Sequence, residues 1–206
     1  PGDQVLIADP GYPCNRHFVR LMEGEAVGIA VDASTDYQLT ADLLAQHWTD
    51  RTVAVLLASP SNPTGTLVPM DSLREMAELV TARGGRLIVD EIYHGLTYGE
   101  PDKDSKAGTA LGLSQKESNE LFVINSFSKH FCMTGWRLGW LIGPTPVMKL
   151  AAKMNGQTVT SAATFTMEAA VAALTERVRP WRYEKHQNQY VNVAETLRKA
   201  MCQNPY

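Results

Sequence analysis

The stretch "LFVINSFSKHFCMTGWRLGW", residues 121–140, joins an apolar run to a polar turn that contains a lysine. Its first six residues show the short, β-branched and aliphatic pattern that is typical of a buried strand. Lys129 follows this run by three positions, and Arg137 follows the lysine by eight. A single lysine in a loop is most often a solvated surface residue. The meaning of Lys129 therefore depends on where the other strands of the chain end.

Similar aliphatic runs alternate with segments of helical period, which predicts an α/β fold with a mostly parallel sheet sandwiched by helices. The expected strands are Gln4–Asp9, Ala26–Val31, Val53–Ala58, Arg86–Asp90, Leu121–Ser126 and Leu138–Ile142. The expected helices are Thr40–Gln46, Met70–Arg83, Pro144–Asn155, Thr164–Arg177 and Arg182–Gln203. The polar, Gly- and Ser-rich stretch 99–119 is expected to be a connection rather than core.

The composition is that of an ordinary soluble globular protein. Of 206 residues, 44% are hydrophobic and 20% are charged, and the formal net charge is -3, which does not favour a nucleic-acid partner. Three scattered cysteines form no disulfide framework or C-x-x-C pair, so we expect a cytoplasmic protein without a metal site. No apolar stretch approaches the ~20 residues that cross a bilayer, and no membrane partner is expected.

Three polar residues follow expected strands. Asn62 comes after Val53–Ala58, Asp90 closes Arg86–Asp90, and Lys129 comes after the strand quoted above. Ligands of parallel α/β sheets bind outside the carboxyl ends of the strands, so these side chains are expected to converge on one pocket. Taken singly, each has an ordinary interpretation as a turn residue, a helix cap or a solvated charge.

The joint pattern is more specific than any of its members. "SPSNPTG" (59–65), "VDEIYHGLTYG" (89–99) and "SFSKHFCMTGWRLGW" (126–140) resemble the class I and II aminotransferases, pyridoxal-5'-phosphate (PLP) enzymes of the aspartate aminotransferase fold. The resemblance implies a PLP-binding large domain at residues 1–180 that lacks its N-terminal part. It also implies a long helix at 181–206 that leads to a small C-terminal domain. Because the chain opens at Pro1 and stops just past a helical pattern, we interpret it as an internal piece.

The resemblance also implies a role for each site residue. Lys129 is similar to the lysine that holds the cofactor as a Schiff base and later moves a proton. Asp90 is similar to the carboxylate that faces the pyridine nitrogen. The other expected cofactor contacts are the ring-oxygen donors Asn62 and Tyr93, the phosphate ligands Ser126, Ser128 and Arg137, and the stacking aromatic Tyr12.

These residue types suit that chemistry on physical grounds. A carboxylate keeps a ring nitrogen protonated, which makes the ring an electron sink. Hydrogen-bond donors to the ring oxygen stabilise its anion and lower the pKa of the imine. A guanidinium offers phosphate a planar, two-pronged contact.

The expected function is therefore transfer of an amino group from an L-amino acid to a 2-oxo acid, through a pyridoxamine phosphate intermediate, by a homodimer. Two alternatives remain open. One is a PLP-dependent carbon–sulfur β-lyase or synthase, which needs the same Lys129, Asp90 and Arg137; relatives of that kind tend to carry histidine where Tyr93 stands. The other is an aminotransferase-like ligand-sensing domain of a transcription regulator, which a basic DNA-binding module would precede.

Overall fold

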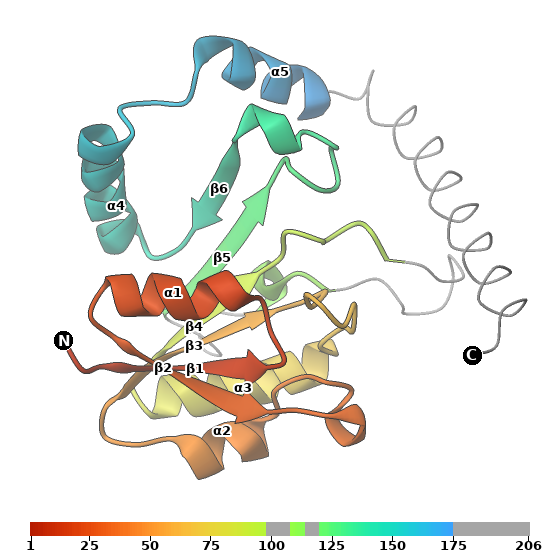
Figure 1. Ribbon diagram of the computed structural model, residues 1–206, viewed down its shortest axis with the longest axis vertical. Coiled ribbons are helices and arrows are strands. Elements are labelled where there is room, and N and C mark those ends of the chain that lie inside the picture. The colour runs from red at the N-terminus through yellow and green to blue at the C-terminus, as the bar shows by residue number, and fades with distance from the viewer. Residues whose placement is uncertain (98–107, 114–119, 175–206) are drawn as a thin grey trace, which may run out of the picture.

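The computed structural model describes residues 1–97, 108–113 and 120–174 (Figure 1). The strands are β1 (Gln4–Asp9), β2 (Glu25–Ala30), β3 (Thr52–Ala58), β4 (Arg86–Asp90), β5 (Leu121–Ser126) and β6 (Gly139–Ile142). The α-helices are α1 (Pro13–Leu21), α2 (Ala41–His47), α3 (Met70–Ala82), α4 (Thr145–Thr158) and α5 (Thr164–Leu174).

The described strands form one sheet in the order β2-β1-β3-β4-β5-β6. The first five run parallel, and β6 pairs antiparallel with β5, with Ser126 opposite Gly139. This confirms the mostly parallel α/β sheet. Because parallel strands point the same way, the loops that follow β1, β3, β4 and β5 all leave the sheet at one edge.

Helices cover both faces of the sheet. Helices α2 and α3 lie on one face, and α1 lies on the opposite face over β1 and β2 (Figure 1). The main core is on the α2–α3 side, where Leu6, Val55 and Leu87 of three neighbouring strands are fully buried together with Met76 of α3. Full burial of such side chains stabilises the fold by ~1.5–3 kcal/mol each. The core fixes the strands on which the candidate site depends.

A second apolar cluster supports the connection between β5 and β6. Phe127, Phe131 and Met133 from this connection are buried against Ala170 and Ala173 of α5. The ring of Phe127 also meets the ring of Trp140 on β6 edge to face, with centroids 5.1 Å apart. The segment that carries Lys129 is thus anchored on both sides by packed aromatic residues.

Several boundaries differ from those expected. The expected strand Ala26–Val31 is β2, shifted one residue toward the N-terminus because Glu25 pairs with Gln4. Likewise β3 begins at Thr52, which also pairs with Gln4, and β6 begins at Gly139. Helix α2 is one residue later than Thr40–Gln46 because Thr40 is its cap, its Oγ1 accepting from Leu43 N at 3.2 Å.

The bounds of two other helices also differ from those expected. Helix α3 ends at Ala82 because Arg83 is its cap. Helix α4 begins after its cap Pro144 and runs past Gly156 to Thr158, because a glycine inside a helix costs only ~1 kcal/mol. Helix α5 begins at Thr164 as expected. It is described as far as Leu174, so that residues 175–177 of the expected Thr164–Arg177, the expected helix Arg182–Gln203 and the segment 181–206 lie outside the described residues.

Helix α1 was not expected from the sequence. Parallel strands need a crossover, and α1 supplies the one between β1 and β2. It was missed because the segment is only nine residues long and rich in polar side chains, although its apolar residues share one face. The signal that was available is Pro13 at the first helical position, where proline is favoured.

The stretch 99–119 was expected to be a connection rather than core, and its described part corrects that expectation. Ala110 and Leu113 are buried in the main cluster, 0% and 8% exposed. The buried carboxylate of Glu91 fixes this part: it accepts from Ala110 N at 2.7 Å and from Thr109 Oγ1 at 3.0 Å. Among the described helices, none is long and apolar enough to cross a membrane.

Candidate active site

The loops after β3, β4 and β5 meet at the carboxyl edge of the sheet. Asp90 is paired with Ala58 on one side and with Ile124 on the other. The strand ends are tied further by Ser59 N, which donates to Asp90 O at 3.1 Å, and by Glu91 N, which donates to Ile124 O at 2.8 Å. The sheet itself therefore brings together segments that are far apart in the sequence.

Three of the expected site residues lie close to one another. Asn62 Nδ2 is 3.5 Å from the Tyr93 hydroxyl oxygen. Lys129 Nζ lies over the Tyr93 ring, 5.5 Å from its centroid. Lys129 is half-buried and not fully solvated. A lysine amine and two neutral donors from three different loops thus surround one space.

Asp90 is largely removed from water. Burial raises the pKa of its carboxyl group, the backbone N–H of Ile92 lowers it, and the charge of Glu91 raises it further. Ile92 N donates to Asp90 Oδ1 at 3.0 Å. No salt bridge to Asp90 forms among the described residues. A partly buried carboxylate of this kind is suited to a cationic or protonated ligand group, because such a partner offsets the cost of desolvation.

This burial predicts an effect on the cofactor-free protein. Because the folded-state pKa of Asp90 is raised, the folded state binds the proton more tightly, and stability falls as pH rises through that range. Asp90→Asn keeps the shape and the acceptor for Ile92 N but removes the charge. We expect the cofactor-free variant to resist urea better than the parent at neutral pH, with the advantage shrinking as the carboxyl group protonates.

Urea titrations of both proteins at several pH values measure this difference. A parent that is as stable as the variant at neutral pH would contradict the cost assigned to the buried carboxylate.

Tyr12 stands at the start of α1, on the same edge. Its hydrogen bond with the Cys14 side chain is the largest of several causes that raise the pKa of the Tyr12 phenol, and the charges of Tyr93 and Asp90 contribute. The ring is 41% exposed, so a face remains open for stacking. Together with Asn62 and Ser61, Tyr12 lines a small hollow above the ends of β1 and β3.

Ser126 and Ser128 form a hydroxyl pair at the end of β5. Ser126 Oγ lies 2.9 Å from Ser128 Oγ and 3.0 Å from Leu138 O, and it accepts from Ser128 N at 3.0 Å. Arg137 adjoins this pair through the backbone of Leu138. Its exposed guanidinium donates from Nη1 to Thr134 O at 2.9 Å, and Thr134 Oγ1 donates to Ser128 O at 2.8 Å.

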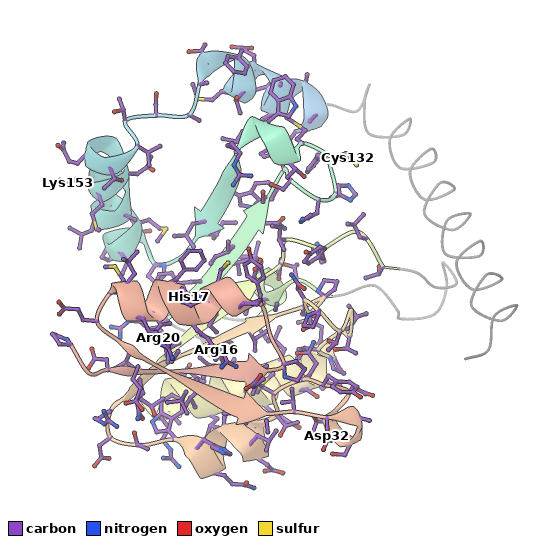
Figure 2. The ribbon with its side chains drawn as sticks, viewed as in Figure 1. Arg16, His17, Arg20, Asp32, Cys132 and Lys153 are labelled. Carbon is purple, nitrogen blue, oxygen red and sulfur yellow. The ribbon has the colours of Figure 1, made fainter. Side chains whose placement is uncertain are left out.

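The conformation of Arg137 is unusual. It has φ 51° and ψ 52°, the left-handed region that non-glycine residues rarely adopt. This turn carries the chain from the short 3-10 helix Thr134–Trp136 into β6. Figure 2 marks Cys132, which also has a positive φ of 54°, in the same connection. Such strain tends to be kept where a fixed geometry is needed.

A pocket of about 490 Å³ opens beside Asn62 and Tyr93. Its other walls include Leu67 and Leu96, and none of the described residues that line it is charged. The pocket therefore offers a mainly apolar space that adjoins two of the expected cofactor contacts.

Two contacting residues were missed by the sequence analysis. Cys14 bonds to Tyr12, and the buried Gln38 bonds to the loop that carries Asn62. Nothing in the local sequence distinguishes Gln38 from a turn residue. Cys14 could have been found only from its place beside "DPGYP".

The donor set fits PLP. Asp90 offers a half-buried carboxylate for a ring nitrogen, Asn62 and Tyr93 offer donors at hydrogen-bond separation, and Lys129 offers an amine beside them. The serine hydroxyls and Arg137 are the groups that bind phosphate in proteins. Their assignment to individual cofactor atoms stays a prediction.

Comparison with known proteins agrees with this fit. A model of the family described as aminotransferase class I and II matches residues 1–203. Valine–pyruvate aminotransferase of Mycobacterium tuberculosis is 39% identical over 175 residues, 84% of this chain and 43% of that protein. A probable aspartate/prephenate aminotransferase of Aquifex aeolicus is 33% identical over 173 residues, with the same coverage of 84% and 43%.

Solved structures of aminotransferases are also similar to this chain. A tetra mutant of Thermus thermophilus aspartate aminotransferase superposes with a TM-score of 0.88 at 26% identity, over 98% of this chain and 54% of that one. The chain spans less than half the length of the two curated relatives. The match of nearly the whole chain to the family model shows that it belongs to the class I and II aminotransferases.

Proposed function

We propose that the whole protein transfers the amino group of an L-amino acid to a 2-oxo acid, with Lys129 as the residue that carries PLP. The observation that supports this most directly is the meeting of Lys129, Tyr93 and Asn62, at 5.5 Å and 3.5 Å, at the sheet edge where the half-buried Asp90 ends β4. Class I and II aminotransferases of this fold depend on PLP. When bound, PLP stabilises the negative charge that is left on the α carbon of the amino acid after proton removal.

Lys129 has two tasks in this proposal. Its Nζ would hold the cofactor covalently. Once the substrate amine had displaced it, the freed Nζ would accept the proton from the α carbon of the amino acid and hold it for return. The ring of Tyr93 beneath Nζ and the half-buried position of the side chain limit its movement between these tasks.

The remaining residues bind and orient the cofactor. Asp90 keeps a proton on the pyridine nitrogen by charge pairing, which its desolvation strengthens. Asn62 and Tyr93 donate to the ring oxygen, and Tyr12 stacks on the ring. Ser126, Ser128 and Arg137 bind the phosphate, so that the ring is held at one end by the Lys129 segment and at the other by the end of β4. Homodimer formation and the domain boundary at residue 180 stay predictions.

The amino acid that reacts is expected to leave as a 2-oxo acid. We expect the full-length protein, mixed with a panel of amino acids but no oxo acid, to convert bound PLP to the pyridoxamine form and to release a stoichiometric 2-oxo acid without ammonia. Addition of a second 2-oxo acid should restore the original absorbance. Valine and aspartate enter the panel because the relatives named above include valine–pyruvate and aspartate/prephenate enzymes.

The same panel distinguishes transamination from the β-lyase alternative. Release of ammonia and pyruvate from cystathionine, with no pyridoxamine form, would mean elimination in place of transamination. All three relatives described above carry aminotransferase names, and this is the observation that favours transamination.

A further inference from the structure

Gln38 is a buried side chain outside the expected site. It lies between β2 and α2 and is only 5% exposed. Its Nε2 is 2.9 Å from Thr66 O, 3.2 Å from Thr66 Oγ1 and 3.3 Å from Ala58 O. Because carbonyl oxygens only accept hydrogen bonds, the amide nitrogen and not the amide oxygen must face this group.

The three acceptors belong to the two ends of one loop. Residues 59–68 leave β3 after Ala58 and return through Thr66, where Ser61 N donates to Thr66 O at 2.9 Å. Inside that closure, Gly65 N donates to Ser61 O at 2.9 Å. The loop returns to its start where Val68 N donates to Ser59 Oγ at 3.0 Å. Gln38, from a different part of the chain, joins the end of β3 to the returning segment of the loop at Thr66.

Asn62 lies within this closed loop. Its Nδ2 is already 3.5 Å from the Tyr93 hydroxyl, at the outer limit of a hydrogen bond. A shift of the loop by a few tenths of an ångström therefore decides whether Asn62 is in reach of Tyr93 and of the atom that both residues address. Removal of the Gln38 amide would take one donor from each of the partly buried carbonyls of Ala58 and Thr66, and the loop can relieve this loss by moving toward water.

We propose that Gln38 is a positioning residue that sets the place of the Asn62 amide and thereby tunes the protonation of the bound cofactor. The inference rests on the proposed function, in which Asn62 donates to the ring oxygen of PLP. Gln38 acts through the backbone of residues 58–66, since its amide contacts Ala58 and Thr66, neither of which is an expected cofactor ligand.

The test uses the full-length protein loaded with PLP and the variant Gln38→Met, which fills a similar volume without donors. We expect the pH midpoint of the cofactor's absorbance change to rise by about half a unit, and Asn62→Ala to raise it by about one unit, since one pKa unit is about 1.4 kcal/mol. The double variant should match Asn62→Ala alone, because in this proposal Gln38 acts through Asn62.

The matched control is Gln4→Met. Gln4 is also a buried glutamine, 6% exposed, and bonds through its side chain to Glu25 at 3.1 Å and to Thr49 at 2.6 Å. It lies at the start of β1, at the opposite end of the strands from the site. This variant should leave the midpoint where the parent has it, although it loses stability in the same way.

A second readout uses the cofactor-free protein. Amide hydrogen exchange at Ser61 and Gly65, whose N–H groups close the loop, should quicken at least several-fold in Gln38→Met and stay unchanged in Gln4→Met. If Gln38→Met does not fold, Gln38→Asn, which is one methylene shorter, enters both measurements with the same expected directions.

An unchanged midpoint in Gln38→Met, or a double variant whose shift equals the sum of the single shifts, would overturn the positioning role while leaving the proposed function intact. If Asn62→Ala itself leaves the midpoint unmoved, the assignment of Asn62 to the cofactor is wrong, and the inference falls with it.

Discussion

Lys129→Ala is expected to lower the rate of transamination by about 10⁴-fold, the upper end of what a lost general base costs. The variant loses both the covalent link to PLP and the amine that moves the proton. Cofactor binding should persist without the link, because Asp90, Arg137 and the serine pair remain. The variant therefore distinguishes the binding of the cofactor from the proton transfer that follows.

Borohydride reduction and peptide mapping measure the covalent link. In the parent, reduction should fix PLP to the peptide that contains Lys129. Lys153→Ala is the matched control, since this lysine is exposed on α4 and far from the candidate site (Figure 2). Labelling of any other lysine in the parent, or labelling that persists in Lys129→Ala, would contradict the assignment of Lys129 as the residue that carries PLP.

The second large effect is expected at Asp90. Asp90→Asn cannot keep a proton on the pyridine nitrogen, and a charge partner at this range shifts a pKa by about 1–3 units, so the rate of α-proton exchange should fall by up to about 10³-fold. The same substitution is expected to stabilise the cofactor-free protein. Opposite effects of one change on stability and on chemistry would mark a group that is kept for function.

Deuterium exchange at the α carbon, followed by NMR in the loaded full-length protein, measures the chemical effect. The control is Asp32→Asn, which removes an exposed carboxylate that only caps the turn at Ser34 N, 2.8 Å away. Equal exchange rates in the parent and in Asp90→Asn would show that the carboxylate has no part in proton removal.

Much of the sheet could be predicted because its strands are aliphatic and end in polar residues. Both ends of Gln4–Asp9, Arg86–Asp90 and Leu121–Ser126 are confirmed. Helix α1 does have a helical apolar pattern, but the pattern spans only nine residues and was overlooked. The burial of Ala110 could not be predicted, because its partner Glu91 lies 19 positions away and only the folded chain brings the two together.

The site was predictable to the extent that topology places it. Asn62, Asp90 and Lys129 each follow a strand, and parallel strands end together. Gln38 lies in the connection after β2, well past the end of that strand, and its side chain reaches Thr66 across 28 positions of sequence. A buried glutamine inside a turn segment has no sequence pattern of its own, so residues that only orient others are found from contacts and not from motifs.

The antiparallel ladder between β5 and β6 has a consequence for protein engineering. Ser126 opposite Gly139, with Phe127 N donating to Leu138 O at 3.1 Å, closes the chain reversal that carries Lys129 on one arm and Arg137 on the other. An insertion or deletion of a single residue between them would slip the ladder and turn one arm to the wrong face. Mutant libraries made to change substrate preference should therefore vary side chains elsewhere and keep the length of this reversal fixed.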